Sequence, residues 1–294
     1  MSIIIRFLIS ALLALGCVDR AFAQTSFSKE SFTATDGTAL PYRKASIPGI
    51  GDKASLVIYL HGGSSKGDDN ETQMQEPGIN SITEWLTQNN RKAIMVVPQC
   101  AKDKSWIGDM LVTVKAMLQT FVDRGVADNV YIFGGSMGGT GTWNMLSLYP
   151  NFFAAAMPVA GNPSRLNAEN VAQTPLFTVM GTADRLMKIP TVESFLADMD
   201  AYNAEYRFET EEGWSHEDTC KKSYTKERLN WVFSHKRNTE SGVNAINAND
   251  NVSTTWFSLD GQRLNGKPQQ KGIYIKKCAD SNGQLKSTKI AIGI

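Results

Sequence analysis

Short apolar runs alternate with longer helical stretches through the middle of the chain, and this alternation limits the possible folds more than any other feature. The apolar runs lie at 55–60, 93–98, 129–133, 154–160, 175–180 and 205–210. The helical stretches lie near 79–90, 107–124, 137–149, 190–202 and 223–236. Runs that are apolar at nearly every position indicate strands buried on both faces. The alternation therefore predicts an α/β fold with a doubly wound, mostly parallel sheet.

The regions on either side predict the domain organisation. Residues 28–47 predict an antiparallel hairpin that turns at Asp36-Gly37, a strong turn dipeptide. Residues 238–255 are rich in Asn, Ser and Thr without an apolar period, which is typical of a linker. A β-rich tail follows over 256–294, too short to bury a large core. We therefore expect one large domain over 24–237, then the linker and the tail.

The first residues have the layout of an export signal. Arg6 precedes an apolar stretch over 7–16, and Ala21-Phe22-Ala23 resembles a cleavage site. Residues 1–23 therefore predict a cleaved signal peptide and a secreted or cell-surface protein, with the periplasm as the alternative. An amphipathic first helix and a lipoprotein anchored through Cys17 are the other interpretations.

Export would place the remaining cysteines in an oxidising compartment. Cys100, Cys220 and Cys278 follow the predicted signal. A Cys100–Cys220 disulfide would hold the loop near residue 220, but three reduced cysteines fit the sequence equally well. The sequence leaves both states open.

The charge balance argues against two classes of protein. The 294 residues include 30 Lys and Arg against 29 Asp and Glu, a net charge of +1. Nucleic-acid binding proteins usually carry a basic field, and this chain has no strongly basic stretch. After the first few dozen residues no apolar run is long enough for a bilayer, so we expect no integral membrane segment.

A glycine-flanked serine lies between a predicted strand and a predicted helix. The sequence Gly134-Gly135-Ser136-Met137-Gly138-Gly139 follows the apolar run that ends at Phe133. A serine on a sharp strand-to-helix turn needs strained backbone angles and neighbours without side chains. The helix dipole at this end favours developing negative charge. The segment therefore predicts a nucleophile at Ser136, with a tight turn without chemistry as the alternative.

A serine nucleophile needs a base, and the chain has three histidines. His61 lies in a glycine-containing loop after an earlier strand, and His235 ends the last predicted helix, where a solvated surface position is the ordinary interpretation. His216 lies in the polar segment Gly213–Glu217, after the last strand of the predicted sheet. Its place after every strand makes it the candidate base.

The third member of a triad is a carboxylate that orients the imidazole. Asp184 follows the run at 175–180 directly, in Gly181-Thr182-Ala183-Asp184. Asp198 and Asp200 fall late in a helix, where we expect them to face water. Asp184 is therefore the candidate, and a helix N-cap is its structural alternative.

Attack by serine on an ester creates an oxyanion, which backbone amides can stabilise. The Met137 amide follows the nucleophile, and the loop His61-Gly62-Gly63-Ser64 exposes its backbone. We expect the second donor to be Gly63, or else Gly62, and His61 to support the loop. An ordinary glycine turn is the other interpretation of this loop.

Two tryptophans lie in loops near the predicted site. Trp106 and Trp214 could line a pocket for a planar acyl or sugar group, although packing in the core or at a rim explains each equally well. The acidic run at 68–71 is expected to be a solvated loop rather than a cation site. No metal or cofactor is expected.

These residues resemble a known family. Residues 53–236 resemble the α/β-hydrolase fold, and specifically secreted serine esterases of the polyhydroxybutyrate-depolymerase, feruloyl-esterase and acetyl-xylan-esterase kind. The resemblance is carried by YLHGG (59–63), FGGSMGGTGTWNMLSLYPNFFAAAMPVAG (133–161), GTADRLMKIP (181–190) and GWSH (213–216). It implies a Ser136, Asp184 and His216 triad with Gly63 and Met137 as the oxyanion hole. The elbow and its helix also resemble prolyl-oligopeptidase-type hydrolases and cytosolic carboxylesterases.

The tail has a resemblance of its own. WFSLDGQRL (256–264) and KGIYIKK (271–277) look like the carboxy-terminal sorting domains of type IX secretion. This likeness implies a contact with secretion machinery, and a small carbohydrate-binding module is the competing interpretation.

Together these features predict a secreted serine esterase that forms an acyl-enzyme. Few large insertions separate the strands, so we expect a shallow, open site that suits acetyl or feruloyl esters on plant polysaccharide. Peptide cleavage is the nearest rival. A binding protein that keeps the fold without turnover is the rival from another class.

Overall fold

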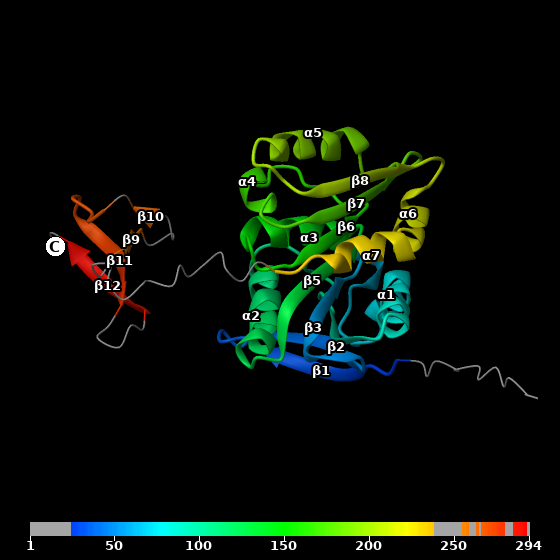
Figure 1. Cartoon of the computed structure of the whole chain (residues 1–294), viewed down its shortest axis with the longest axis horizontal. Coiled ribbons are helices and arrows are strands. Elements are labelled where there is room, and N and C mark those ends of the chain that lie inside the picture. The colour runs from blue at the N-terminus through cyan, green and yellow to red at the C-terminus, as the bar shows by residue number, and fades with distance from the viewer. Residues whose placement is uncertain (1–24, 238–254, 259–262, 265, 280–284, 293–294) are drawn as a thin grey trace, which may run out of the picture. The chain divides into compact units, whose positions relative to one another are not determined.

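A computed structural model describes residues 25–237, 255–258, 263–264, 266–279 and 285–292. The chain divides into two compact units, Met1–Asn238 and Thr239–Ile294, and each is described by itself (Figure 1). The predicted signal at 1–23 and residues 238–254 of the predicted linker lie outside the described residues, so the predicted domain limits stay predictions.

The first unit is built on an eight-stranded sheet with the order β1-β2-β4-β3-β5-β6-β7-β8. Its strands are β1 (Ser28–Thr33), β2 (Ala39–Ile47), β3 (Ile50–Leu60), β4 (Arg91–Pro98), β5 (Ala127–Gly135), β6 (Ala155–Val159), β7 (Leu176–Gly181) and β8 (Tyr206–Glu211). Strand β2 pairs antiparallel with both β1 and β4, and the pairs from β4 through β8 are parallel. This confirms the predicted α/β class and the antiparallel hairpin at the N-terminal edge.

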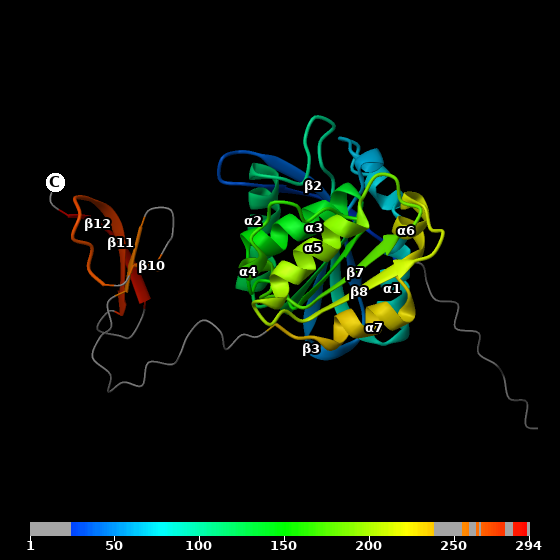
Figure 2. The ribbon, with the colours of Figure 1, turned by 90° about the horizontal axis from the view of Figure 1, so that it is seen from above.

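Helices cover both faces of this sheet (Figure 2). The helices are α1 (Pro77–Gln88), α2 (Asp109–Asp123), α3 (Met137–Leu148), α4 (Ala168–Val171), α5 (Ile189–Asp200), α6 (His216–Lys222) and α7 (Lys226–Ser234), with 3-10 turns η1 (Gly63–Ser65) and η2 (Thr72–Gln75). Helices α2 to α5 contribute to one buried apolar cluster, and α1 and α7 to the other.

Strand β5 shows why the central runs are apolar at nearly every position. Val130 and Ile132 belong to one cluster, whereas Tyr131 and Phe133 belong to the cluster on the opposite face. Successive side chains of a strand point to opposite faces, so a strand covered on both sides has no position left for a polar side chain.

The structure differs from the predicted elements in the last helical region. The predicted helix at 223–236 is α7, and the additional helix α6 precedes it, beginning at His216. Ser215 caps α6: its side chain accepts from the Asp218 amide, and the Asp218 side chain bonds back to the Ser215 amide. His216 therefore lies in the first turn of a helix and not in an irregular loop.

The second unit is a four-stranded antiparallel sheet with the order β10-β9-β11-β12. Its strands are β9 (Thr255–Phe257), β10 (Arg263–Leu264), β11 (Gly272–Ala279) and β12 (Leu285–Ile292). Trp256 is its buried aromatic residue. The predicted turn at Asp260-Gly261 lies outside the described residues. No described helix in either unit has the length and apolar character needed to cross a bilayer.

Candidate active site

Ser136 occupies a strained turn between β5 and α3. Its backbone has φ +58° and ψ −118°, in the region that side-chain-bearing residues rarely adopt. Its amide donates to the Val159 carbonyl at 3.0 Å and its carbonyl accepts from the Thr140 amide at 2.9 Å. The Ser136 hydroxyl does not cap α3, so it is available to a partner outside the helix.

Glycines beside Ser136 allow the close approach that holds this turn. A Cβ atom on Gly138 would lie 2.5 Å from the Leu60 carbonyl carbon, and one on Gly134 would lie 2.9 Å from the Leu60 oxygen. Both positions therefore exclude a side chain, and the end of β3 packs directly against the beginning of α3.

The structure brings Ser136, His216 and Asp184 into one hydrogen-bonded chain. His216 Nε2 lies 2.7 Å from Ser136 Oγ, and His216 Nδ1 lies 2.7 Å from Asp184 Oδ2. The imidazole is 18% exposed and the carboxylate is fully buried. With the Nδ1 proton donated to the carboxylate, Nε2 can accept the serine proton, which is the arrangement a general base requires.

Asp184 is held by its own loop at the end of β7. Its second oxygen, Oδ1, accepts from the Leu186 amide at 2.8 Å and the Met187 amide at 2.9 Å. The Ala183 amide also donates to the Trp214 carbonyl at 3.0 Å, which ties this loop to the segment that carries His216. Asp198 and Asp200, the competing carboxylates, are exposed on α5.

The backbone around the serine leaves two amides for an oxyanion. Met137 is the first residue of α3, and the first amides of a helix have no acceptor within that helix. The Gly63 amide has no acceptor among the described residues, and a Cβ added at Gly63 would meet no atom within 4 Å. The Gly62 amide, the second candidate, is already donated to Glu76 Oε1 at 2.8 Å, so the geometry argues against Gly62 as a donor.

His61 is fully buried and supports the Gly62-Gly63 loop. Its Nε2 accepts from the Cys100 amide at 2.9 Å, so Nδ1 carries the proton and donates to the Gly62 carbonyl at 2.7 Å. Burial lowers the pKa of His61 to about 4, which keeps the imidazole neutral at pH 7. A neutral imidazole can both accept and donate here, whereas a protonated one could not accept.

Trp106 belongs to the core and not to a pocket wall. Its side chain is 1% exposed, its indole N–H donates to the His61 carbonyl at 2.9 Å, and its ring lies edge-on to that of His61. The prediction that it contacts substrate is wrong for this structure, because no face of the indole reaches the surface. Trp214 is half-buried and packs against Arg228 and Lys222, and its role in binding stays a prediction.

Cys100 and Cys220 are free thiols, so the structure does not contain the Cys100–Cys220 bridge. Cys220 packs against the elbow, where a Cβ on Gly135 would lie 3.3 Å from its sulfur. Burial raises the pKa of Cys100 to about 11 and that of Cys220 to about 12. Neither thiol is therefore a reactive nucleophile at neutral pH.

Sequence reasoning passed over Glu76, which contacts the Gly62-Gly63 loop directly. It is 9% exposed and lies just before α1. A buried carboxylate needs hydrogen-bond donors, but its partners follow from the fold, and the sequence alone carried no sign of them.

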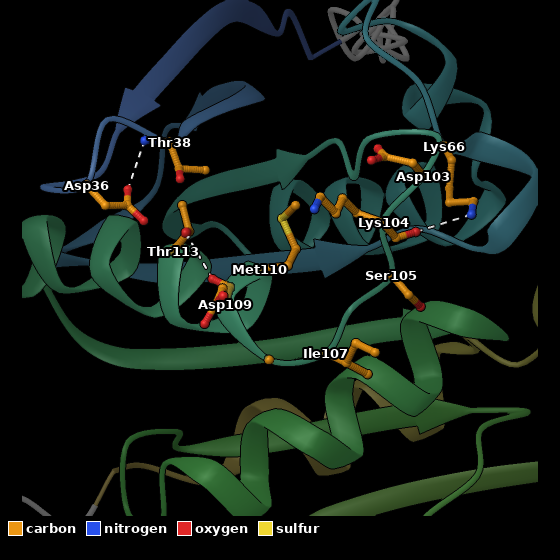
Figure 3. A pocket seen from close by; sticks show the side chains of 11 residues that line it. Asp36, Thr38, Lys66, Asp103, Lys104, Ser105, Ile107, Asp109, Met110 and Thr113 are labelled. Atoms are coloured by element: carbon orange, nitrogen blue, oxygen red, sulfur yellow. Dashed lines mark hydrogen bonds between the residues drawn. The ribbon is translucent and has the colours of Figure 1, made fainter.

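A cleft of about 630 Å³ lies on the edge of the sheet where the parallel strands end (Figure 3). Lys66 follows the Gly63–Ser65 turn, and Ser105 and Ile107 flank the buried Trp106. Asp36 and Thr38 close the far end, because β2 begins opposite the end of β4. The cleft therefore extends from Lys66, which directly follows the Gly63–Ser65 turn, to the β1–β2 turn, and its lining does not include Ser136, Asp184 or His216.

Comparisons with known proteins find esterases among those similar to this chain in sequence or in fold. No protein-family model matches the chain. A bifunctional acetylxylan esterase/xylanase from Neocallimastix patriciarum is 28% identical over 160 residues, which cover 50% of this chain and 22% of that protein. The chain thus spans about a fifth of the length of this curated relative.

Two solved structures show the same fold. A thermostable esterase matches with a TM-score of 0.66 and 24% identity, covering 72% of this chain and 63% of the other. A ferulic acid esterase matches with a TM-score of 0.56 and 14% identity, covering 71% and 98% respectively. The first unit therefore has the α/β-hydrolase fold.

Proposed function

We propose that this chain is a serine carboxylesterase that works through an acyl-enzyme. The observation that carries the proposal is the chain of two 2.7 Å contacts from Ser136 through His216 to Asp184, beside the Met137 amide at the start of α3 and the Gly63 amide, which has no acceptor among the described residues. The likeness to an acetylxylan esterase/xylanase supports the same reaction class.

The first half of the reaction would form the acyl-enzyme. His216 Nε2 takes the proton of Ser136 as Oγ attacks the ester carbonyl carbon, and the Met137 and Gly63 amides stabilise the resulting oxyanion. The tetrahedral intermediate collapses when His216 returns the proton to the departing alcohol. The buried Asp184 carboxylate stabilises the imidazolium while it exists.

The second half would repeat these steps with water. His216 removes a proton from the water, which attacks the acyl carbonyl, and Ser136 leaves with that proton to release the acid. No other co-reactant is needed.

We further propose that the alcohol side of the ester is a polysaccharide chain that carries acetyl or feruloyl groups. The cleft beside the Gly63 loop supports this, because its walls alternate carboxylates, ammonium groups and hydroxyls, which can bond to sugar hydroxyls. The side chains of Asp103 and Lys104 have no ion-pair partner within the described parts of the chain, so both are free to bind a ligand.

The expected site of action is outside the cell. We propose that residues 1–23 are removed during export and that the tail contacts secretion machinery. Removal of residues 1–23 would make Gln24 the first residue, and sequencing the N-terminus of the mature protein tests this. Release of a tail-deleted chain from cells tests the second.

A fluorophosphonate probe tests the chemistry most directly. Wild type should be labelled and should hydrolyse p-nitrophenyl acetate, whereas Ser136→Ala should do neither. His216→Ala should lose most of the hydrolysis. An unlabelled, inactive wild type would instead support a binding protein on the same fold, and faster cleavage of a proline peptide than of any ester would support the peptidase alternative.

A further inference from the structure

The loop that carries the Gly63 amide is held from outside by a buried carboxylate. Glu76 Oε1 accepts from the Gly62 amide at 2.8 Å and from the Ser65 hydroxyl at 2.7 Å. Glu76 lies at the N-terminus of α1, yet its side chain makes no capping bond to that helix. Its carboxylate is directed at the loop instead.

The same turn is fastened from its other side. The Gly62 carbonyl accepts from His61 Nδ1 at 2.7 Å and from the Ser65 amide at 3.2 Å. Both backbone groups of Gly62 are therefore engaged, and the neighbouring Gly63 amide is the one left without an acceptor within the described residues. The bonds to Gly62 determine where the Gly63 amide points.

The turn also lies against the nucleophile. A Cβ on Gly62 would lie 3.3 Å from Glu76 Oε1 and 3.8 Å from Ser136 Cβ. A displacement of the turn by one ångström would thus change the distance between the Gly63 amide and an oxyanion formed at Ser136. Amide donors are effective only when they lie about 2.7–3.1 Å from the developing charge.

We propose that Glu76 is a positioning residue of the oxyanion site, which aligns the Gly63 amide through its bonds to Gly62 and Ser65. This inference rests on the proposed esterase function. Glu76 touches neither substrate nor reacting atoms, and it acts through the loop.

Electrostatics makes the proposal specific. Glu76 has no ion-pair partner in the described part of the chain, and a bare carboxylate near a developing oxyanion opposes that charge. Glu76 must therefore contribute through the position of its acceptor oxygen and not through its charge. A neutral acceptor at the same place should work equally well.

Three substitutions separate these properties. Glu76→Gln keeps an acceptor oxygen at full reach without the charge, Glu76→Asp keeps the charge but shortens the reach, and Glu76→Ala removes both. We expect Glu76→Gln to keep kcat for p-nitrophenyl acetate within about threefold of wild type. Glu76→Asp and Glu76→Ala should lower kcat about 10- to 100-fold with KM within about threefold, because an oxyanion donor acts mainly in the transition state.

Two further readouts distinguish positioning from a general loss of structure. The affinity for a phenylboronic acid, whose serine adduct is tetrahedral, should fall in parallel with kcat across the series. Ser65→Ala removes one of the two bonds to the carboxylate and should lower kcat several-fold even if Glu76→Ala does not fold. Glu84→Ala, an exposed position on the same helix, is the matched control and should leave kcat and Tm unchanged.

These measurements distinguish a failure of the Glu76 inference from a failure of the esterase proposal. If wild type shows no Ser136-dependent hydrolysis, the esterase proposal fails. Two outcomes with an active wild type would show that the inference is wrong while the esterase proposal stands. In the first, Glu76→Ala and Ser65→Ala fold and keep wild-type kcat. In the second, Glu76→Gln is as inactive as Glu76→Ala while Glu76→Asp is active.

Discussion

Replacing Gly138 with alanine should damage both the fold and the site. Gly138 is the second residue of α3 and packs on the end of β3. A Cβ there would lie 2.5 Å from the Leu60 carbonyl carbon and 2.9 Å from the His61 oxygen. These are backbone atoms, so no side-chain rotation relieves the contact. Ordinary contact needs about 3.5–4.0 Å between carbon atoms, so α3 must move away from β3 by roughly an ångström.

The energetic cost follows from this displacement. Forcing an additional carbon into a packed region costs about 1–3 kcal/mol, and each kcal/mol lowers Tm by about 2–4 °C in a domain of this size. We expect Tm to fall by about 5–10 °C. The Met137 amide precedes Gly138 and moves with it, so kcat for p-nitrophenyl acetate should fall about 100-fold, as when one oxyanion donor is lost.

Leu148→Ala is the matched control for this prediction. Leu148 is the last residue of α3 and is 51% exposed, so its truncation leaves the contact between α3 and β3 intact. Tm should stay within about 2 °C of wild type and kcat within about threefold. A Gly138→Ala enzyme with native Tm and kcat would refute the close-approach argument.

Three other perturbations test the site and its support. Asp184→Asn should lower kcat about 10³–10⁴-fold, because an amide no longer holds the reactive His216 tautomer, and an unchanged rate would exclude the carboxylate from the mechanism. His61 has a folded pKa of about 4 against about 6.5 when unfolded, so folding favours its neutral form and stability should fall by about 3 kcal/mol as pH drops from 6.5 to 4. Urea unfolding of wild type and of His61→Gln between pH 6.5 and 4 measures the contribution of His61 to this loss of stability. If the free energy of unfolding fell equally steeply with pH in both proteins, His61 would not be its source. Cys100 and Cys220 should react with a thiol reagent at pH 8 only on unfolding, and a Tm that falls with reductant in a Cys278→Ala chain would instead indicate a bridge.

The fold could be predicted because its signals are local. Strand β5 is apolar on both faces, and the glycines after it permit a turn that few other residues allow, so the position of Ser136 at a strand end follows from the sequence. The same reasoning locates Asp184, which comes three residues after the end of β7. Parallel strands bring such ends to one edge of the sheet.

Helix α6 was missed although its signal is present. Ser215 followed three residues later by Asp218 is a capping-box pattern, but the helix has only 7 residues and no apolar period. A search for caps rather than for periodicity would have found it. It matters because the cap determines the direction in which His216 leaves the backbone.

The supporting residues could not be predicted, because their partners are chosen by the tertiary structure. Trp106 lies between two cleft residues in sequence, yet its own side chain points inward to the His61 carbonyl. Glu76 looks like an ordinary charged residue before a helix until the fold places the Gly62 amide beside it. A sequence pattern reports which residues are polar, not which buried donor each will meet.

Close approaches of backbone explain why three distant segments meet within hydrogen-bonding distance. Gly138 lets α3 contact the end of β3, and Gly181 lets the end of β7 contact the segment before His216, where a Cβ would lie 2.9 Å from the Trp214 carbonyl carbon. The first contact sets the nucleophile against the oxyanion loop, and the second sets the carboxylate against the histidine. Because the two contacts serve different pairs, Gly181→Ala should weaken the His216–Asp184 alignment and leave boronic acid adducts less affected than Gly138→Ala does. Equal loss of adduct affinity in both variants would show that the site moves as one rigid body.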